Sequence, residues 1–215
     1  MRLLRVHIGI CNNIVLAVIT GNVSGVPEGK GVLTSTHNDH VLINFVDHGG
    51  PGTIYFPDFI PFQAVTLNAG LQTMYSKKMY SKLVFYLEAC EAGSIFDKQL
   101  PNNTNIYAVT ASNTDESSWG TYCPGEEDDN GGAMVDGVDI DSCLGDLFSV
   151  NWMEDSDRVG IAESLTTQFV AATCAVLRAF CVIDQEAERR VCMKPSLKQH
   201  VRTCIPLVTE IVVFE

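Results

Sequence analysis

Short apolar runs rich in β-branched and aromatic residues recur along the first half of the chain. They are bounded by Gly, Pro, Asn or Asp, which typically separate strands from turns. Continuous apolar runs of this length are typical of strands buried on both faces of a parallel sheet. We therefore expect sheet strands at residues 14–19, 41–46, 83–87 and 106–110.

Three other segments have apolar residues at helical intervals. Residues 62–82 predict a helix that crosses between the second and third strands, and residues 144–155 predict a second helix with one apolar side. Residues 161–194 contain neither Gly nor Pro and predict a long, mostly buried helix. The alternation of strands and helices gives an α/β fold class, a parallel sheet flanked by helices.

Composition and charge narrow the class of protein. The chain has 215 residues, of which 46% are hydrophobic, enough for one domain with a real core. Its net charge of -12 repels phosphate groups, which argues against binding to nucleic acid or to anionic membranes. An apolar stretch at residues 169–183 is shorter than the roughly 20 residues that a membrane crossing requires. We therefore predict no membrane insertion.

Acidic residues are concentrated between Lys98 and Arg158, where no Lys or Arg occurs. Residues 124–142 also contain several glycines and predict an acidic, flexible surface loop. A calcium site is the alternative, but the spacing of Asp128, Asn130, Asp139 and Asp141 does not match an EF-hand. A solvated loop is the preferred interpretation, and we predict no metal site.

The N-terminal segment only partly resembles a signal peptide. Arg2 and Arg5 precede an apolar stretch, but Asn12 and Asn13 interrupt it, so residues 1–21 carry no convincing signal. The chain has two glycosylation sequons, at Asn22 and Asn102. These asparagines would be modified only in a secreted or endomembrane protein.

Eight cysteines are many for a chain of this length and hint at an oxidising compartment. No CxxC spacing indicates a zinc site. Cys174 and Cys181 are seven residues apart and would share one face of the predicted helix, where small buried thiols are the preferred interpretation. The sequence leaves open how Cys11, Cys174, Cys181, Cys192 and Cys204 are paired.

Two predicted strands run directly into reactive side chains. Residues 41–46 lead to Asp47-His48-Gly49, and residues 83–87 lead to Glu88-Ala89-Cys90. The carboxyl ends of adjacent parallel strands open into one crevice, so His48 and Cys90 are expected to lie together. A cysteine attacks as its thiolate with a histidine as proton acceptor and donor. The amides of Gly49 and Cys90 are candidate oxyanion donors.

Four longer motifs carry a specific resemblance. They are NDHVLINFVDHGGPG (38–52), LVFYLEACEAGSIF (83–96), NIYAVTASNTDESSWGTYCPGEE (105–127) and CLGDLFSVNWMEDSD (143–157). Their order and content resemble the legumain family of asparaginyl endopeptidases, which includes the plant vacuolar processing enzymes. The resemblance implies a caspase-like α/β fold, cleavage of peptides and proteins after exposed Asn and less readily Asp, no cofactor, and a vacuolar or lysosome-like location.

The resemblance also implies roles for individual residues. Cys90 matches the nucleophile, His48 the general acid/base and Gly49 an oxyanion donor. The residues that match the pocket for the Asn side chain are Glu88, Ser118 and Asp146. Carboxylates suit this pocket because a carboxamide has an NH2 group to donate. Cys123 and Cys143 match a disulfide pair that closes the acidic loop.

The start of the chain departs from the family pattern. Family members have an N-terminal portion with the first central strand, an Asn that orients the catalytic His and an Arg in the substrate pocket. We expect this chain to lack that strand, to expose a sheet edge that is a candidate for self-association, and to cleave Asn peptides poorly. The predicted division is a partial peptidase domain at residues 1–160 and a mostly helical segment at residues 161–215, whose relation to the family prodomain is left open.

Three functions follow as hypotheses. The leading one is a cysteine endopeptidase that forms an acyl-enzyme on Cys90 with His48 as general acid/base. The second is a catalytically weak or inactive homologue that acts at most as a peptide-binding module. The third is a transpeptidase, in which an amine instead of water resolves the acyl-enzyme.

Overall fold

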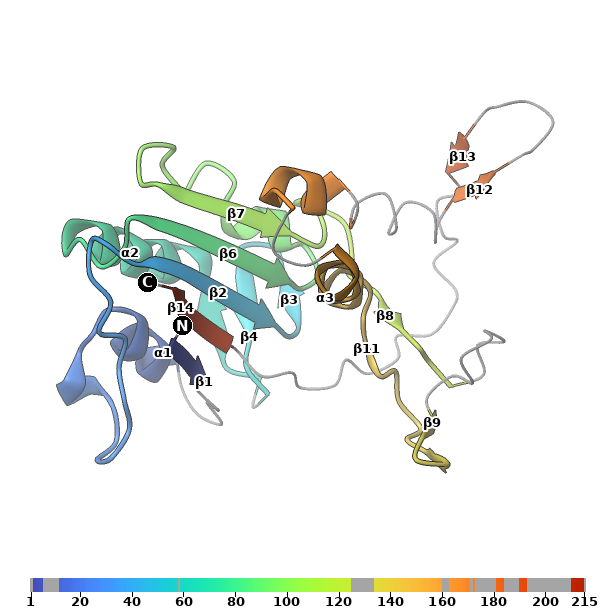
Figure 1. Ribbon diagram of the computed structural model, residues 1–215, viewed down its shortest axis with the longest axis horizontal. Helices are drawn as coiled ribbons and strands as arrows, with labels where there is room; N and C mark the ends of the chain where they lie inside the picture. The colour runs from blue at the N-terminus through green and yellow to red at the C-terminus, as the bar shows by residue number, and fades with distance from the viewer. Residues whose placement is uncertain are drawn as a thin grey trace. The chain divides into compact units, whose positions relative to one another are not determined.

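The computed structural model describes residues 2–5, 12–57, 59–124, 134–159, 163–170, 172, 181–183, 190–192 and 210–214. The chain divides into two compact units, shown together in Figure 1. The first contains Met1–Ser118 and Pro206–Glu215, and the second contains Trp119–Ile205.

The first unit is built on a five-stranded sheet. The strand order is β1 (Arg2–Arg5), β14 (Glu210–Phe214), β2 (His40–Val46), β6 (Lys82–Glu88) and β7 (Ile106–Thr110), as Figure 1 shows. Strands β2, β6 and β7 are parallel, whereas β14 and β1 are antiparallel to their neighbours. The structure confirms the strands predicted at residues 41–46, 83–87 and 106–110, and with them the α/β fold class.

The core residues of β2 and β6 alternate along each strand, with Val41, Ile43 and Phe45 opposite Leu83, Phe85 and Leu87, so they lie on one face of the sheet. Helix α2 (Ala64–Ser76) makes the crossover between β2 and β6, which confirms the helix predicted within residues 62–82. Its buried residues Leu67, Leu71 and Met74 join the core formed by the strands. Full burial of side chains of this size stabilises a fold by about 1.5 to 3 kcal/mol each.

The apolar run at residues 14–19 forms a helix, so the strand predicted there is wrong. Helix α1 (Asn12–Ile19) buries Val15, Val18 and Ile19 in the same core as α2. The two helices approach closely at Gly70, where a Cβ would lie 2.7 Å from a methyl group of Leu16. A run of six apolar residues fits a buried helix as well as a buried strand, because both are apolar all round.

The edge of β2 is occupied, which corrects the expectation that this edge is exposed. Strand β14 pairs antiparallel with β2 from Glu210 opposite Asn44 to Phe214 opposite His40. Strand β1 then pairs with the other side of β14. The sequence Glu-Ile-Val-Val-Phe of β14 has the β-branched and aromatic character of strands. Residues distant in sequence thus satisfy the backbone groups of the β2 edge.

A small antiparallel sheet follows β2 in the first unit. It consists of β3 (Gly49–Gly50), β4 (Thr53–Tyr55) and β5 (Pro61–Gln63). Ile54 and Phe62 form a cross-strand pair in this sheet, and each has 1% of its surface exposed. The chain that leaves β2 is therefore anchored in the core soon after His48.

The described residues of the second unit form short strands and helices. Strand β8 (Gly120–Thr121) pairs with β11 (Gly145–Asp146), and β9 (Met134–Val135) pairs with β10 (Val138–Asp139). Helix α3 (Leu147–Val159) confirms the helix predicted at residues 144–155, displaced by a few residues toward the C-terminus.

Part of the predicted acidic loop is a hairpin. Asp136 and Gly137 connect β9 to β10 and both have positive φ, 51° and 79°. An Asp-Gly pair with positive φ at both positions is a preferred two-residue hairpin turn. Asp128 and Asn130, two of the candidate calcium ligands, lie outside the described residues.

The long helix predicted over residues 161–194 is interrupted by strands. Residues 165–170 are helical, but β12 (Cys181–Ile183) and β13 (Arg190–Cys192) form an antiparallel pair with Cys181 opposite Cys192. Val182, Ile183 and Val191 are β-branched and favour a strand when a partner is present. Cys11, Cys174 and Cys204 lie outside the described residues. Among the described helices, none has the length and apolar character needed to cross a bilayer.

Candidate functional site

The pairing of β2 with β6 brings two reactive segments to the same end of the sheet. The last pair in register is Val46 opposite Glu88, and the backbone N–H of Asp47 donates to the carbonyl of Glu88 at 3.1 Å. His48 and Cys90 each follow this pair by two residues. Both residues therefore lie just beyond the carboxyl ends of their strands, at the same level of the sheet.

Gly49 lies directly against the backbone of Cys90. A Cβ on Gly49 would be 2.2 Å from the carbonyl oxygen of Cys90 and 2.8 Å from the Cβ of Ala89. Real Cβ atoms do not approach a carbonyl oxygen so closely, so this position accepts only glycine without a backbone shift. The contact places the segment after His48 beside the segment that carries the Cys90 thiol.

His48 is held by backbone contacts and by an aromatic ring. Its N–H donates to Oδ1 of Asp47 at 2.7 Å, and its carbonyl accepts from the N–H of Tyr55 at 2.9 Å. The imidazole stacks on the ring of Phe59, with centroids 5.9 Å apart and planes 18° from parallel. Phe59 has a positive φ of 59° and is 71% exposed. Sequence reasoning missed Phe59, because a single aromatic residue between two prolines carries no periodic signal.

Cys90 is a half-buried free thiol in a tight turn. Its Sγ lies 3.8 Å from the carbonyl oxygen of Ser118. Glu91 follows it in the left-handed conformation, with φ of 51° and ψ of 27°. Partial burial disfavours the charged carboxylate and raises the pKa of Glu91.

The hydroxyl of Ser112 spans the turn that presents Cys90. It donates to the carbonyl of Ala89 at 2.9 Å and accepts from the N–H of Ala92 at 3.0 Å. In an ordinary tight turn these two backbone groups bond to each other directly. Here the Ser112 hydroxyl lies between them and bonds to both, which holds the turn. Sequence reasoning did not identify Ser112, because a serine after a strand is ordinary and its contacts lie about twenty residues away.

Two of the residues that the family resemblance places in the substrate pocket contact each other. Ser118 Oγ donates to Oε1 of Glu88 at 3.0 Å, and only 2% of Glu88 is exposed. Glu88 is the last residue of β6, two positions before Cys90. Asp146 belongs to the second unit, where it is 5% exposed and pairs with Gly120 across β11 and β8. The structure thus brings Glu88 and Ser118 together within one unit, the unit that also contains His48 and Cys90.

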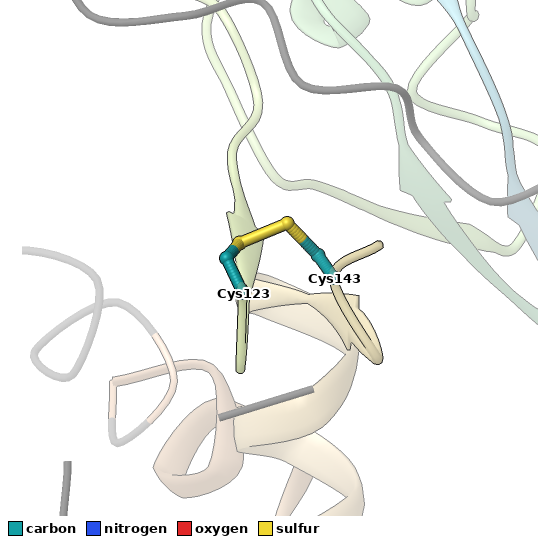
Figure 2. The surroundings of a disulfide bond; sticks show 2 residues. All are labelled: Cys123 and Cys143. Carbon is teal, nitrogen blue, oxygen red and sulfur yellow. A yellow bond between two sulfur atoms is a disulfide. The ribbon is translucent and has the colours of Figure 1, made fainter. Parts of the chain in front are cut away.

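Cys123 and Cys143 form a disulfide within the second unit, and Figure 2 shows the bond between their sulfur atoms. Both cysteines are buried, with 8% and 6% of their surfaces exposed. Gly120 packs against this bond, since a Cβ there would lie 3.0 Å from Sγ of Cys143. The bond closes the chain segment that contains the β9–β10 hairpin.

The two sequons differ in their surroundings. Asn22 is exposed and its Oδ1 accepts a hydrogen bond from the Ser24 hydroxyl at 2.8 Å. Asn102 is exposed, but Thr104 of its sequon is 1% exposed and donates to the carbonyl of Pro101. The structured part of the chain contains no group of three or more His, Cys, Asp or Glu side chains placed to hold a metal ion.

Comparison with known proteins identifies the family. Residues 9–201 match the model of the Peptidase C13 family. The chain belongs to this family. Membership of the C13 family confirms the resemblance to the legumain-type peptidases and agrees with the parallel core of β2, β6 and β7.

Plant proteins are among the relatives of this C13 chain. It is 45% identical over 155 residues to the vacuolar-processing enzyme of Vicia sativa, an alignment that covers 71% of the chain and 30% of that protein. It is 47% identical over 154 residues to the vacuolar-processing enzyme delta-isozyme of Arabidopsis thaliana, covering 71% and 32%. It is 48% identical over 144 residues to the vacuolar-processing enzyme of Citrus sinensis, covering 66% and 28%. The chain thus spans less than a third of the length of these relatives.

Proposed function

We propose that this chain carries the active site of a cysteine endopeptidase that cleaves peptide bonds after Asn and less readily after Asp. The observation that supports this most strongly is the packing of Gly49 against Cys90, because it brings the His48 segment beside the Cys90 thiol. Membership of a peptidase family supports the reaction class. Peptides and proteins with exposed Asn are the proposed substrates.

In the proposed mechanism the Cys90 thiolate attacks the carbonyl carbon of the scissile bond. The N–H groups of Gly49 and Cys90 stabilise the oxyanion that forms. When the C–N bond breaks, His48 gives its proton to the departing amine and a thioester remains on Cys90. His48 then takes a proton from water, the resulting hydroxide attacks the thioester, and the Cys90 thiolate is released.

Selection of Asn is assigned to carboxylate and hydroxyl groups near the nucleophile. A carboxamide side chain donates through its NH2 group and accepts through its oxygen. Glu88 is a buried acceptor for the NH2 group, and its hydrogen bond from Ser118 orients it. An Asp side chain would bring a second carboxylate to Glu88, which disfavours its charged form. Asp146 is assigned to substrate recognition through the family resemblance.

The proposed location is an oxidising endomembrane compartment that leads to the vacuole. The disulfide between Cys123 and Cys143 supports this, since such bonds persist in oxidising compartments. The names of the relatives, vacuolar-processing enzymes, point to the same compartment.

The activity is tested with fluorogenic peptides that end in Ala-Ala-Asn, Ala-Ala-Asp or Ala-Ala-Gln, incubated with the purified chain at acidic pH. We expect release from the Asn peptide to exceed release from the others and to be abolished by Cys90→Ser and by His48→Gln. His37→Gln is the matched control, because His37 is an exposed histidine outside the site. Equal release from the Asn and Gln peptides, or full activity of Cys90→Ser, would contradict the proposal.

The assignment of Glu88 is tested by Glu88→Gln. This substitution keeps the shape of the side chain and removes its charge. We expect the ratio of kcat/KM for Asn over Asp to fall, because the repulsion of the Asp carboxylate is lost. An unchanged ratio would remove Glu88 from the specificity site.

A further inference from the structure

One hydroxyl group joins the loop after His48 to the loop after Cys90. Ser94 lies in the short helical turn η2 (Ala92–Ile95), and its Oγ donates to the carbonyl of Glu91 at 2.6 Å. The same Oγ accepts a hydrogen bond from the N–H of Gly52 at 2.8 Å. Gly52 lies between β3 and β4, four residues after His48, with a positive φ of 69°.

The directions of these two bonds are determined by chemistry. A backbone N–H can only donate and a carbonyl can only accept, so the hydroxyl must accept from Gly52 and donate to Glu91. Only a group that both donates and accepts can join these two atoms. The single hydroxyl proton of Ser94 is used in the bond to Glu91. An alanine at position 94 would leave both backbone groups without this partner.

The link completes a set of contacts between the two segments. The N–H of Asp47 on the carbonyl of Glu88 sets the level at which the strands end. The packing of Gly49 on Cys90 sets how closely the backbones approach. Neither contact restrains the far end of the His48 loop, whereas the bond from Gly52 to Ser94 does.

We propose that Ser94 is a positioning residue that holds His48 and Cys90 in the relative geometry needed for proton transfer, an inference that rests on the proposed function. Ser94 acts through the backbone of both loops. Catalysis is sensitive to such restraint, because a displacement of about 1 Å can reduce a rate about a hundredfold.

The test compares Ser94→Ala, which removes the hydroxyl, with Ser94→Thr, which keeps it. Ser76→Ala is the matched control, because it also removes a serine hydroxyl bonded to a carbonyl, that of Gln72 at 2.8 Å in α2. We expect Ser94→Ala to lower kcat for the Ala-Ala-Asn peptide by about 10- to 100-fold with little change in KM. We expect Ser94→Thr to recover most of the loss and Ser76→Ala to retain full kcat.

A second readout does not depend on turnover. The rate at which iodoacetamide alkylates Cys90, followed by mass spectrometry, reports how the thiol is set beside its base. We expect this rate to be lower in Ser94→Ala than in the wild type and in Ser94→Thr, while circular dichroism shows equal folding.

The two readouts separate failure of the inference from failure of the proposed function. Unchanged kcat and alkylation in Ser94→Ala would overturn the inference, and so would equal losses in Ser94→Ala and Ser94→Thr. A loss explained entirely by a lower folded fraction would also overturn it, since Ser94 would then be only a stabilising residue. A folded wild type without turnover would overturn the proposed function, and the alkylation rates would still decide the role of Ser94.

Discussion

Gly49 and Cys90 are in backbone contact, with the position of a Cβ on Gly49 only 2.2 Å from the carbonyl oxygen of Cys90. The oxygen belongs to the backbone and cannot move away as a flexible side chain could. A side chain at position 49 must therefore separate the two segments that carry His48 and Cys90. We therefore expect the proposed activity to be sensitive to even the smallest side chain at position 49.

Gly49→Ala is expected to abolish measurable cleavage of the Ala-Ala-Asn peptide, a loss of at least about a hundredfold, because the reacting groups move apart. Gly50→Ala is the matched control. A Cβ at Gly50 would meet its nearest neighbour, a methyl group of Thr53, at 3.7 Å, which is an ordinary contact. Near-normal kcat/KM in Gly49→Ala would show that the contact is not needed.

Ser112→Ala is expected to destabilise the first unit by about 2 to 3 kcal/mol, because two hydrogen bonds are lost and buried backbone groups lose their partners. Ser112 is 6% exposed, so water replaces the hydroxyl poorly. Urea unfolding measures the change. Thr73→Ala, which removes an exposed hydroxyl bonded to the carbonyl of Ala69, is expected to change stability by less than about 0.5 kcal/mol. Equal effects of the two substitutions would contradict this role for Ser112.

Glu91 is expected to make the folded state less stable as the pH rises. Burial raises its pKa above the ordinary 4.5, so the folded chain binds the proton more tightly than the unfolded chain. The contribution of Glu91 to the free energy of unfolding is complete at pH values below the ordinary pKa. It is lost as the pH rises through the raised pKa. The glutamine in Glu91→Gln cannot ionise, so this substitution should remove the fall in stability with rising pH.

Thermal unfolding between acidic and neutral pH checks the direction. We expect the Tm of Glu91→Gln relative to the wild type to increase as the pH rises. A Tm difference that stays constant or decreases over this range would show that ionisation of Glu91 does not oppose folding.

Strand β14 is expected to keep the sheet from pairing with other chains. Val212→Pro removes a backbone N–H from a strand that lies between β1 and β2, where proline is not tolerated. The freed edge of β2 should then pair with another molecule, because exposed edges are templates for association. Size-exclusion chromatography with light scattering should show larger species than in the wild type. Val212→Thr, which keeps the N–H, should elute as the wild type does, and an unchanged mass of Val212→Pro would contradict the protective role of β14.

The disulfide between Cys123 and Cys143 is expected to stabilise the second unit. The two cysteines are 20 residues apart in sequence. Closing a loop of that length lowers the conformational entropy of the unfolded chain, which stabilises the folded state by about 3 kcal/mol. Cys123→Ser should lower the Tm under oxidising conditions to the value that the wild type shows with a reductant. Non-reducing peptide mapping should find the two cysteines linked and Cys90 free.

A Cys123→Ser variant with an unchanged Tm would mean that the bond adds no stability. Peptide mapping that links Cys90 to another cysteine would contradict its assignment as the free nucleophile.

Local patterns identified the strands that carry the candidate site. The runs at residues 41–46 and 83–87 are buried strands, and His48 and Cys90 follow them directly, so the shared end of a parallel sheet could be predicted. The four long motifs were also sufficient to identify the family. The run at residues 14–19 shows the limit of this reasoning, because apolar character reports burial and six residues are too few to separate a helix from a strand.

The sequence by itself thus determined the parallel strands that lead to His48 and Cys90, and the family. Only the tertiary structure decided which segment borders β2, since β14 pairs with a strand about 170 residues earlier and pairing leaves no local period. The same holds for the contacts of Ser94 and Ser112, whose hydroxyl groups meet backbone atoms of distant loops. Such contacts depend on where the folded backbone places its donors and acceptors. The presence of a serine in the sequence does not indicate which backbone group its hydroxyl will bind.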